Sequence, residues 1–284
     1  MAAFRGRSRS RRRSPEGSCP ENNGAVQRAC GWQRDLAKEV LSLVDACLED
    51  RILALTCSRC KRVVERLEDI DPQKEGRDRG IYRLLKAISI LLKLRGFDRK
   101  SPPTFEELEI DGQPLVALQR SRTTATSRAL EQAVHLARAS ADIAVVRLTN
   151  CELEAEQGCV GEVVRLVKLL GTGPSAHFLQ EVDLSQNRLD DASAQRIIEA
   201  ALRERVERSA GAGNLKGPLW LDLSANSIRQ PQTLFDRLQA WASWAYREGA
   251  LCMAESPKCC KEACPHGALL HLPRFLEQGR ETAR

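Results

Sequence analysis

A group of cysteine and histidine residues near the C-terminus carries the side chains that bind metal ions. Cys252, Cys259, Cys264 and His266 supply three thiols and one imidazole within a short segment. Three thiolates and an imidazole suit tetrahedral Zn²⁺. Prolines and glycines in the same segment provide the tight turns that a small metal site needs. The sequence therefore predicts a structural zinc site here, and the alternative is that these cysteines pack without metal in a terminal loop.

Two features of this segment limit the assignment. Cys260 directly follows Cys259, so either thiol is a candidate ligand. The ligand spacing does not match the common nucleic-acid-binding finger with three cysteines and one histidine, so that function is not inferred. The segment is also similar to the C-terminal module of certain uncharacterised protist proteins, a resemblance that implies no activity.

A C-x-x-C motif at Cys57 and Cys60 is the second candidate for thiol chemistry. No other C-x-x-C lies close in the sequence, although Cys30 or Cys47 could complete a metal site in space. The surrounding residues predict helix, without the preceding strand that a thioredoxin-like redox motif requires. We expect these cysteines to pack in a helical core.

Signals for catalysis are weak elsewhere. The histidines do not fall in a nucleophile motif. Gly171–Ser175 lacks the Gly-Lys-Ser/Thr of a phosphate-binding loop, and the glycines between 211 and 217 miss the dinucleotide-binding fingerprint by one residue. The sequence therefore predicts a protein that is not an enzyme.

The elements that hold these residues follow a repeat. Four segments fit the template L-x-x-L-x-L-x-x-N-x-L: Phe105–Leu115, Ile143–Leu153, Leu179–Leu189 and Pro218–Ile228. Their sixth positions are 38, 36 and 39 residues apart, and apolar residues at helical spacing follow each copy. A short strand and then a helix at a near-constant period are typical of a solenoid.

The ninth template position is Asn187 and Asn226 in the last two copies, Cys151 in the second and Gln113 in the first. A buried asparagine there can satisfy backbone groups where a strand turns away. Glutamine departs from the pattern, so the first copy is the least regular.

The repeat resembles the leucine-rich repeats of the ribonuclease-inhibitor type, over about half of the chain. The resemblance implies an α/β solenoid with parallel strands inside and helices outside, and a function in binding. The long repeats imply insertions at Gly171–Ser175 and Ala210–Gly217. The alternative is chance alternation in an ordinary α/β domain.

In such a solenoid, the third, fifth and seventh template positions line the concave face. On that assignment six carboxylates oppose one arginine, with one tryptophan as an anchor. Such a face would repel nucleic-acid phosphates and attract a basic protein. The residues predicted to bind the partner are Glu107, Glu109, Asp111, Arg147, Glu181, Asp183, Trp220 and Asp222.

The positive charge of the chain is concentrated at its N-terminus. The formal net charge is +6, and six arginines lie within the first thirteen residues. We expect residues 1–28 to be a disordered Arg/Ser-rich tail that serves as a nuclear import signal, an RNA contact or a transit peptide, or has no specific use. The alternative function is therefore an RNA-associated protein that uses this tail and a zinc-stabilised C-terminal segment. Scarce aromatic residues argue against a folded platform for stacking bases, which favours the protein-binding scaffold.

The remaining composition suggests an intracellular protein, nuclear or cytoplasmic. Eleven cysteines, an odd number over a long chain, indicate reduced thiols more than a disulfide framework. No apolar run is long enough to span a bilayer, and no signal peptide is predicted. We divide the chain into the tail at 1–28, a helical capping region at 29–100, the repeats at 101–247 and a Cys/His-rich segment at 248–284.

Overall fold

A computed structural model of the chain describes residues 34–69, 79–98, 100–116, 128–155, 157–168, 179–211, 217–253, 259, 264–265 and 267–277. Within these residues, seven strands form one parallel sheet in the order β1-β2-β3-β4-β5-β7-β6. The strands are β1 (Ile52–Ala54), β2 (Glu107–Asp111), β3 (Val145–Thr149), β4 (Glu181–Asp183), β5 (Leu219–Asp222), β6 (Leu251–Cys252) and β7 (Leu270–His271).

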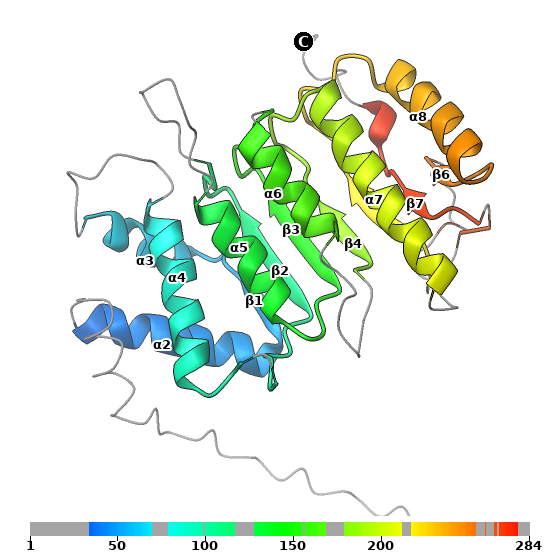
Figure 1. Cartoon of the computed structure of the whole chain (residues 1–284). Helices are drawn as coiled ribbons and strands as arrows, with labels where there is room; N and C mark the ends of the chain where they lie inside the picture. The colour runs from blue at the N-terminus through cyan, green and yellow to red at the C-terminus, as the bar shows by residue number, and fades with distance from the viewer. Residues whose placement is uncertain are drawn as a thin grey trace, which may run out of the picture.

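Helices alternate with these strands and lie side by side along one face of the sheet (Figure 1). They are α2 (Arg34–Asp50), α3 (Ser58–Asp69), α4 (Arg79–Leu94), α5 (Arg128–Ala139), α6 (Gln157–Lys168), α7 (Asp191–Gly211) and α8 (Pro231–Ala245), followed by the short 3₁₀ helix η1 (Phe275–Glu277). The predicted α/β class with parallel strands is therefore confirmed.

The two faces of the sheet differ in burial. Leu108, Val146, Val182 and Leu221 lie in register on neighbouring strands and are almost fully buried beneath the helices. Burying such a side chain stabilises a fold by about 1.5–3 kcal/mol. The alternate side chains of β2 and β3 are only half-buried. A second layer of helices would bury these side chains as well. Because they are only half-buried, the other face of the described sheet is open.

The turn after each central strand contains a residue in the left-handed conformation at one equivalent position, and the turn after β3 contains a second at Glu152. The equivalent residue occupies the eighth template position in all four copies, with φ between 51° and 62°: Gly112, Asn150, Gln186 and Ala225. A non-glycine residue pays about 1–2 kcal/mol for this conformation. Hydrogen bonds between neighbouring turns offset this cost. The N–H of Gln186 donates to Ser224 O at 3.0 Å, and the N–H of Asn150 donates to Ser185 O at 3.2 Å.

Asn187 joins two neighbouring turns from inside the core. Its Oδ1 accepts hydrogen bonds from the N–H groups of Cys151 at 2.9 Å and Leu153 at 3.1 Å. Its Nδ2 donates to the carbonyls of Leu148 at 2.8 Å and Leu184 at 2.9 Å. A single amide therefore satisfies polar backbone groups that the turns leave buried.

The same link recurs on either side of Asn187. Asn226 donates to Leu184 O at 2.9 Å, and the Cys151 thiol donates to Ile110 O at 3.4 Å. In the last three copies, the side chain at the ninth template position thus bonds the carbonyl at the sixth position of the preceding copy. Gln113 is also buried.

Residues 29–100, predicted to form a helical capping region, also contain a short strand that was not predicted. Ile52–Ala54 forms strand β1, which pairs in parallel with β2. Its apolar sequence is too short to separate strand from helix by periodicity. The C-x-x-C motif at Cys57 and Cys60 therefore does follow a strand, in contrast to the prediction.

The C-terminal part of the sheet reverses the order of the chain. β7 pairs with β5 on one side and with β6 on the other. β7 therefore lies between β5 and β6 in the sheet, although it follows β6 in the chain. Both strands are two residues long and were not predicted. Among the helices that the structure describes, none has the length and apolar character needed to cross a membrane.

Candidate functional site

Three cysteines converge beside the last strand of the sheet. Cys252 is in β6, and Cys259 and Cys264 come from the segment that follows it. Cys252 Sγ lies 4.0 Å from Cys259 Sγ, which lies 3.9 Å from Cys264 Sγ. All three sulfurs lie within 4.8 Å of one another, and the three residues are buried or half-buried.

These distances fit a thiolate-bound metal ion. Zn–S bonds of about 2.3 Å in a tetrahedron place two sulfurs about 3.8 Å apart. The predicted ligands Cys252, Cys259 and Cys264 are therefore brought together in a group that could hold a metal ion. Cys260 and the predicted fourth ligand, His266, lie outside the described residues.

His271 is a second candidate for the fourth ligand. It pairs in register with Cys252 on the neighbouring strand, so both side chains are on the same face of the sheet. The His271 side chain is 2% exposed, and its Nδ1 has no hydrogen-bond partner among the described residues. Burial lowers the pKa of His271, which favours the neutral imidazole that binds metals.

The present position of the His271 ring is set by a contact with Trp220, at 4.2 Å between ring centroids. His271 is not part of the group whose ligand atoms all lie within 4.8 Å. The ring would therefore have to move toward the sulfurs to complete a tetrahedral site.

The residues predicted to bind a partner fall into rows across the open face. One row follows the register Glu107, Val145, Glu181 and Trp220. The next row follows Glu109, Arg147, Asp183 and Asp222, and Asp111 pairs with Thr149 in a third. Side chains paired in register share a face, so the structure brings all eight predicted residues to one side of the sheet.

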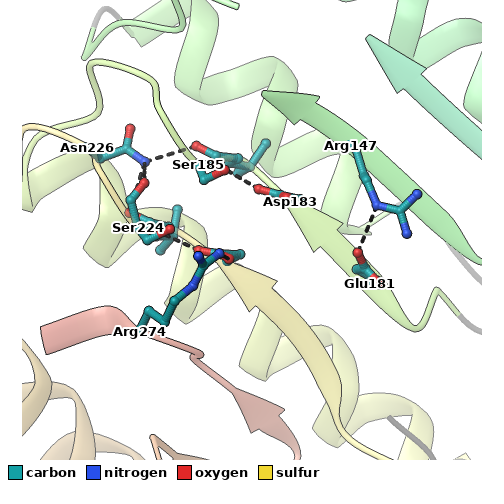
Figure 2. Close-up of polar contacts among 10 residues, drawn as sticks. Arg147, Glu181, Asp183, Ser185, Ser224, Asn226 and Arg274 are labelled. Atoms are coloured by element: carbon teal, nitrogen blue, oxygen red, sulfur yellow. Dashed lines mark hydrogen bonds and ion pairs between the residues drawn. The ribbon is translucent and has the colours of Figure 1, made fainter. Parts of the chain in front are cut away.

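Arg147 is the positive centre of this face. Its guanidinium bonds Glu107 at 2.9 Å and Glu181 at 3.0 Å (Figure 2 shows the second pair). Burial alone would lower the pKa of Arg147, but the attraction of Glu181 and Glu107 raises it overall. The one predicted arginine therefore already bridges two carboxylates on the strands to either side.

Arg274 is a second cation on this face, and sequence reasoning missed it. It follows β7 and forms an ion pair with Asp222 on β5, where Figure 2 shows it reaching across the strand ends. Asp222 also accepts the Ser224 N–H at 2.8 Å, just as Asp183 accepts the Ser185 N–H at 2.8 Å. The ion pair joins residues 52 positions apart, so only the fold reveals it.

The carboxylates still outnumber the arginines. Asp111 accepts a hydrogen bond from Thr149 Oγ1 at 2.7 Å, whereas Glu109 has no side-chain hydrogen bond or ion pair with the described residues. Both acidic side chains are half-buried and lie on β2. The face is therefore acidic even with Arg147 and Arg274 in place.

Comparison with known proteins gives no family. No protein-family model matches the chain, and no curated protein matches its sequence.

Proposed function

We propose that this chain is a non-enzymatic scaffold of the leucine-rich-repeat type that binds a basic protein on the open face of its sheet. The observation that carries the proposal is the register of β2 to β5. It places Glu107, Glu109, Asp111, Glu181, Asp183 and Asp222 on the one face that the described helices leave open.

The assignment to this type of repeat is supported by features that recur once per strand. These are the left-handed eighth position, the buried amide or thiol at the ninth position, and the apolar fourth position beneath the helices. A solenoid stacks equivalent units so that each contacts its neighbours. Such stacking requires that these features recur at equivalent positions of neighbouring strands.

The charges of the open face suit exchange with a cationic partner. The Arg147 pairs with Glu107 and Glu181 are partly exposed, and ion pairs of this kind contribute only about 0–1 kcal/mol. Lysine or arginine side chains of a partner can compete for these carboxylates at little cost. Glu109 can pair with a partner without breaking a hydrogen bond or ion pair to the described residues, and Trp220 supplies aromatic surface in the same face.

The C-terminal cysteines have a structural part in this proposal. Cys252, Cys259 and Cys264 would hold a zinc ion, with His266 or His271 as the fourth ligand. When bound, the zinc would tie the segment after β6 to the edge of the sheet. Three thiolates and one imidazole form a closed set typical of structural sites, which leaves no open position for catalysis.

Binding of defined probes tests the scaffold function. Fluorescence anisotropy would measure the affinity of the full chain for a lysine- and arginine-rich peptide, an acidic peptide of equal length and a single-stranded RNA. We expect the basic peptide alone to bind the folded face, with an affinity that falls as salt rises.

A matched pair of charge reversals locates the binding. Glu109→Lys on the open face should weaken binding of the basic peptide about tenfold, because attraction becomes repulsion. Glu131→Lys on α5, at an exposed position of the helix layer, should leave it unchanged. Equal effects of both changes would contradict the proposal. RNA binding that depends on residues 1–28 would support the RNA-associated alternative.

A further inference from the structure

Cys57 and Cys60 have a geometry that neither the scaffold nor the zinc site uses. Cys57 directly precedes α3, and its carbonyl accepts the Lys61 N–H at 3.1 Å, so it is the N-cap residue of that helix. Its Sγ accepts the Cys60 N–H at 3.4 Å. The thiol thus lies at the positive end of the helix, where a thiolate is stabilised.

The two sulfurs are close enough to form a bond. Cys57 Sγ lies 3.1 Å from Cys60 Sγ, and a disulfide bond is about 2.05 Å long. A movement of about 1 Å would therefore join them. The structure describes both as free cysteines.

The two cysteines differ as the two partners of a redox pair must. Cys57 is exposed, whereas Cys60 is 1% exposed and its thiol faces Ala54 O at the end of β1. Partial burial would raise the pKa of Cys57, but hydrogen bonds from Cys60 and the first turn of α3 lower it overall. Burial, together with the bond to Cys57, raises the pKa of Cys60 to about 12.

The first turns of α3 are basic. Arg59, Lys61 and Arg62 are all exposed there. Exposed positive charge on the helix that carries the thiols attracts anionic reactants. Low-molecular-weight disulfides that carry carboxylates, such as glutathione disulfide, fit this environment.

We propose that Cys57 and Cys60 form a thiol–disulfide exchange site that reacts with anionic low-molecular-weight disulfides, with Cys57 as the attacking thiol and Cys60 as the resolving thiol. The Cys57 thiolate attacks one sulfur of the disulfide, whose S–S bond breaks, and the first thiol leaves with a proton. Cys60 then loses its proton and attacks Cys57 Sγ, which releases the second thiol. Two electrons pass from the dithiol to the disulfide, and the products are one internal disulfide and two thiols.

Mass spectrometry of the full chain treated with glutathione disulfide tests the proposal. The expected product is two hydrogen atoms lighter at this site, and trypsin should release Ile52–Arg59 joined to Cys60–Lys61 by a disulfide. Cys60→Ser should accumulate a glutathione adduct on Cys57, because no resolving thiol remains. Cys57→Ser should react about tenfold more slowly or not at all at this site, because the remaining thiol is buried.

Two controls make the outcome specific. Cys47→Ser replaces a buried free cysteine of α2 that lies outside the pair, and it should leave the exchange unchanged. A neutral disulfide, hydroxyethyl disulfide, should react at a rate that depends less on salt than the rate with glutathione disulfide. Peptide mapping separates this site from the C-terminal cysteines. If Cys57 and Cys60 stay fully alkylatable while other cysteines oxidise, or if the adduct forms on Cys60 as readily as on Cys57, the proposal fails.

Discussion

Removing the buried amide of Asn187 should destabilise this fold strongly. Replacing it with alanine leaves the N–H groups of Cys151 and Leu153 without their acceptor, and both residues are fully buried. Each orphaned buried group costs about 1–3 kcal/mol, so Asn187→Ala should lower the free energy of unfolding by about 2–6 kcal/mol. That is a large part of the 5–15 kcal/mol typical of a folded domain.

Urea unfolding followed by circular dichroism would measure this change. With a denaturant dependence of about 1–3 kcal/mol per molar, the midpoint should fall by at least about 0.7 M. Gln132→Ala is the matched control, because it removes one side-chain amide whose Nε2 donates to Ser89 Oγ at 2.6 Å between helices. It should cost only about 0.5–1.5 kcal/mol. If Asn187→Ala costs no more than Gln132→Ala, the turns do not depend on the buried amide and the reasoning is wrong.

Three further predictions concern the metal, a helix cap and the tail. Purified chain should contain about one zinc ion, and Cys264→Ala should lose both the metal and thermal stability, as elemental analysis and melting curves would show. Whichever of His266→Ala and His271→Ala also loses zinc identifies the fourth ligand, and metal-free reduced protein would contradict the site. Asp190→Ala should cost about 1 kcal/mol at pH 7. Hydrogen bonds from Ser193 lower the pKa of Asp190. The difference in unfolding free energy between the original chain and the variant should therefore be present above about pH 4 and vanish as the pH falls through the folded pKa. A difference that does not change with pH in urea unfolding would contradict the cap. Deleting residues 1–18 should tighten binding of the basic peptide at low salt if the Arg-rich tail competes for the acidic face, and unchanged affinity would rule out that competition.

The central strands were predictable because their apolar positions alternate. Val146 and Leu148 point toward the helices while Arg147 does not, and a shift by one residue would bury the arginine. Local helix signals were also reliable. Asp190 caps α7 through the Ser193 N–H at 2.8 Å, and Pro231 begins α8, as aspartate and proline commonly do at helix starts.

Contacts between distant segments were not predictable. Asp191, the first residue of α7, accepts the N–H groups of Arg229 and Gln230 from the next strand–helix unit. The ion pair between Arg274 and Asp222 depends on β7 lying beside β5, and two-residue strands leave no periodic signal. His271 lies next to Cys252 only because β6 pairs with β7. The sequence therefore offered no basis for choosing between His266 and His271 as the fourth zinc ligand.

The order of the last strands has a consequence for how such a chain could grow or shrink by gene duplication. β7 lies between β5 and β6, so a new unit appended after β6 would meet an edge strand whose partner comes later in the chain. A copy inserted between β2 and β5 would instead meet strands in sequential order on both sides. Adding or removing a whole strand–helix unit among β2 to β5 therefore keeps sequential neighbours, whereas an addition after β6 does not.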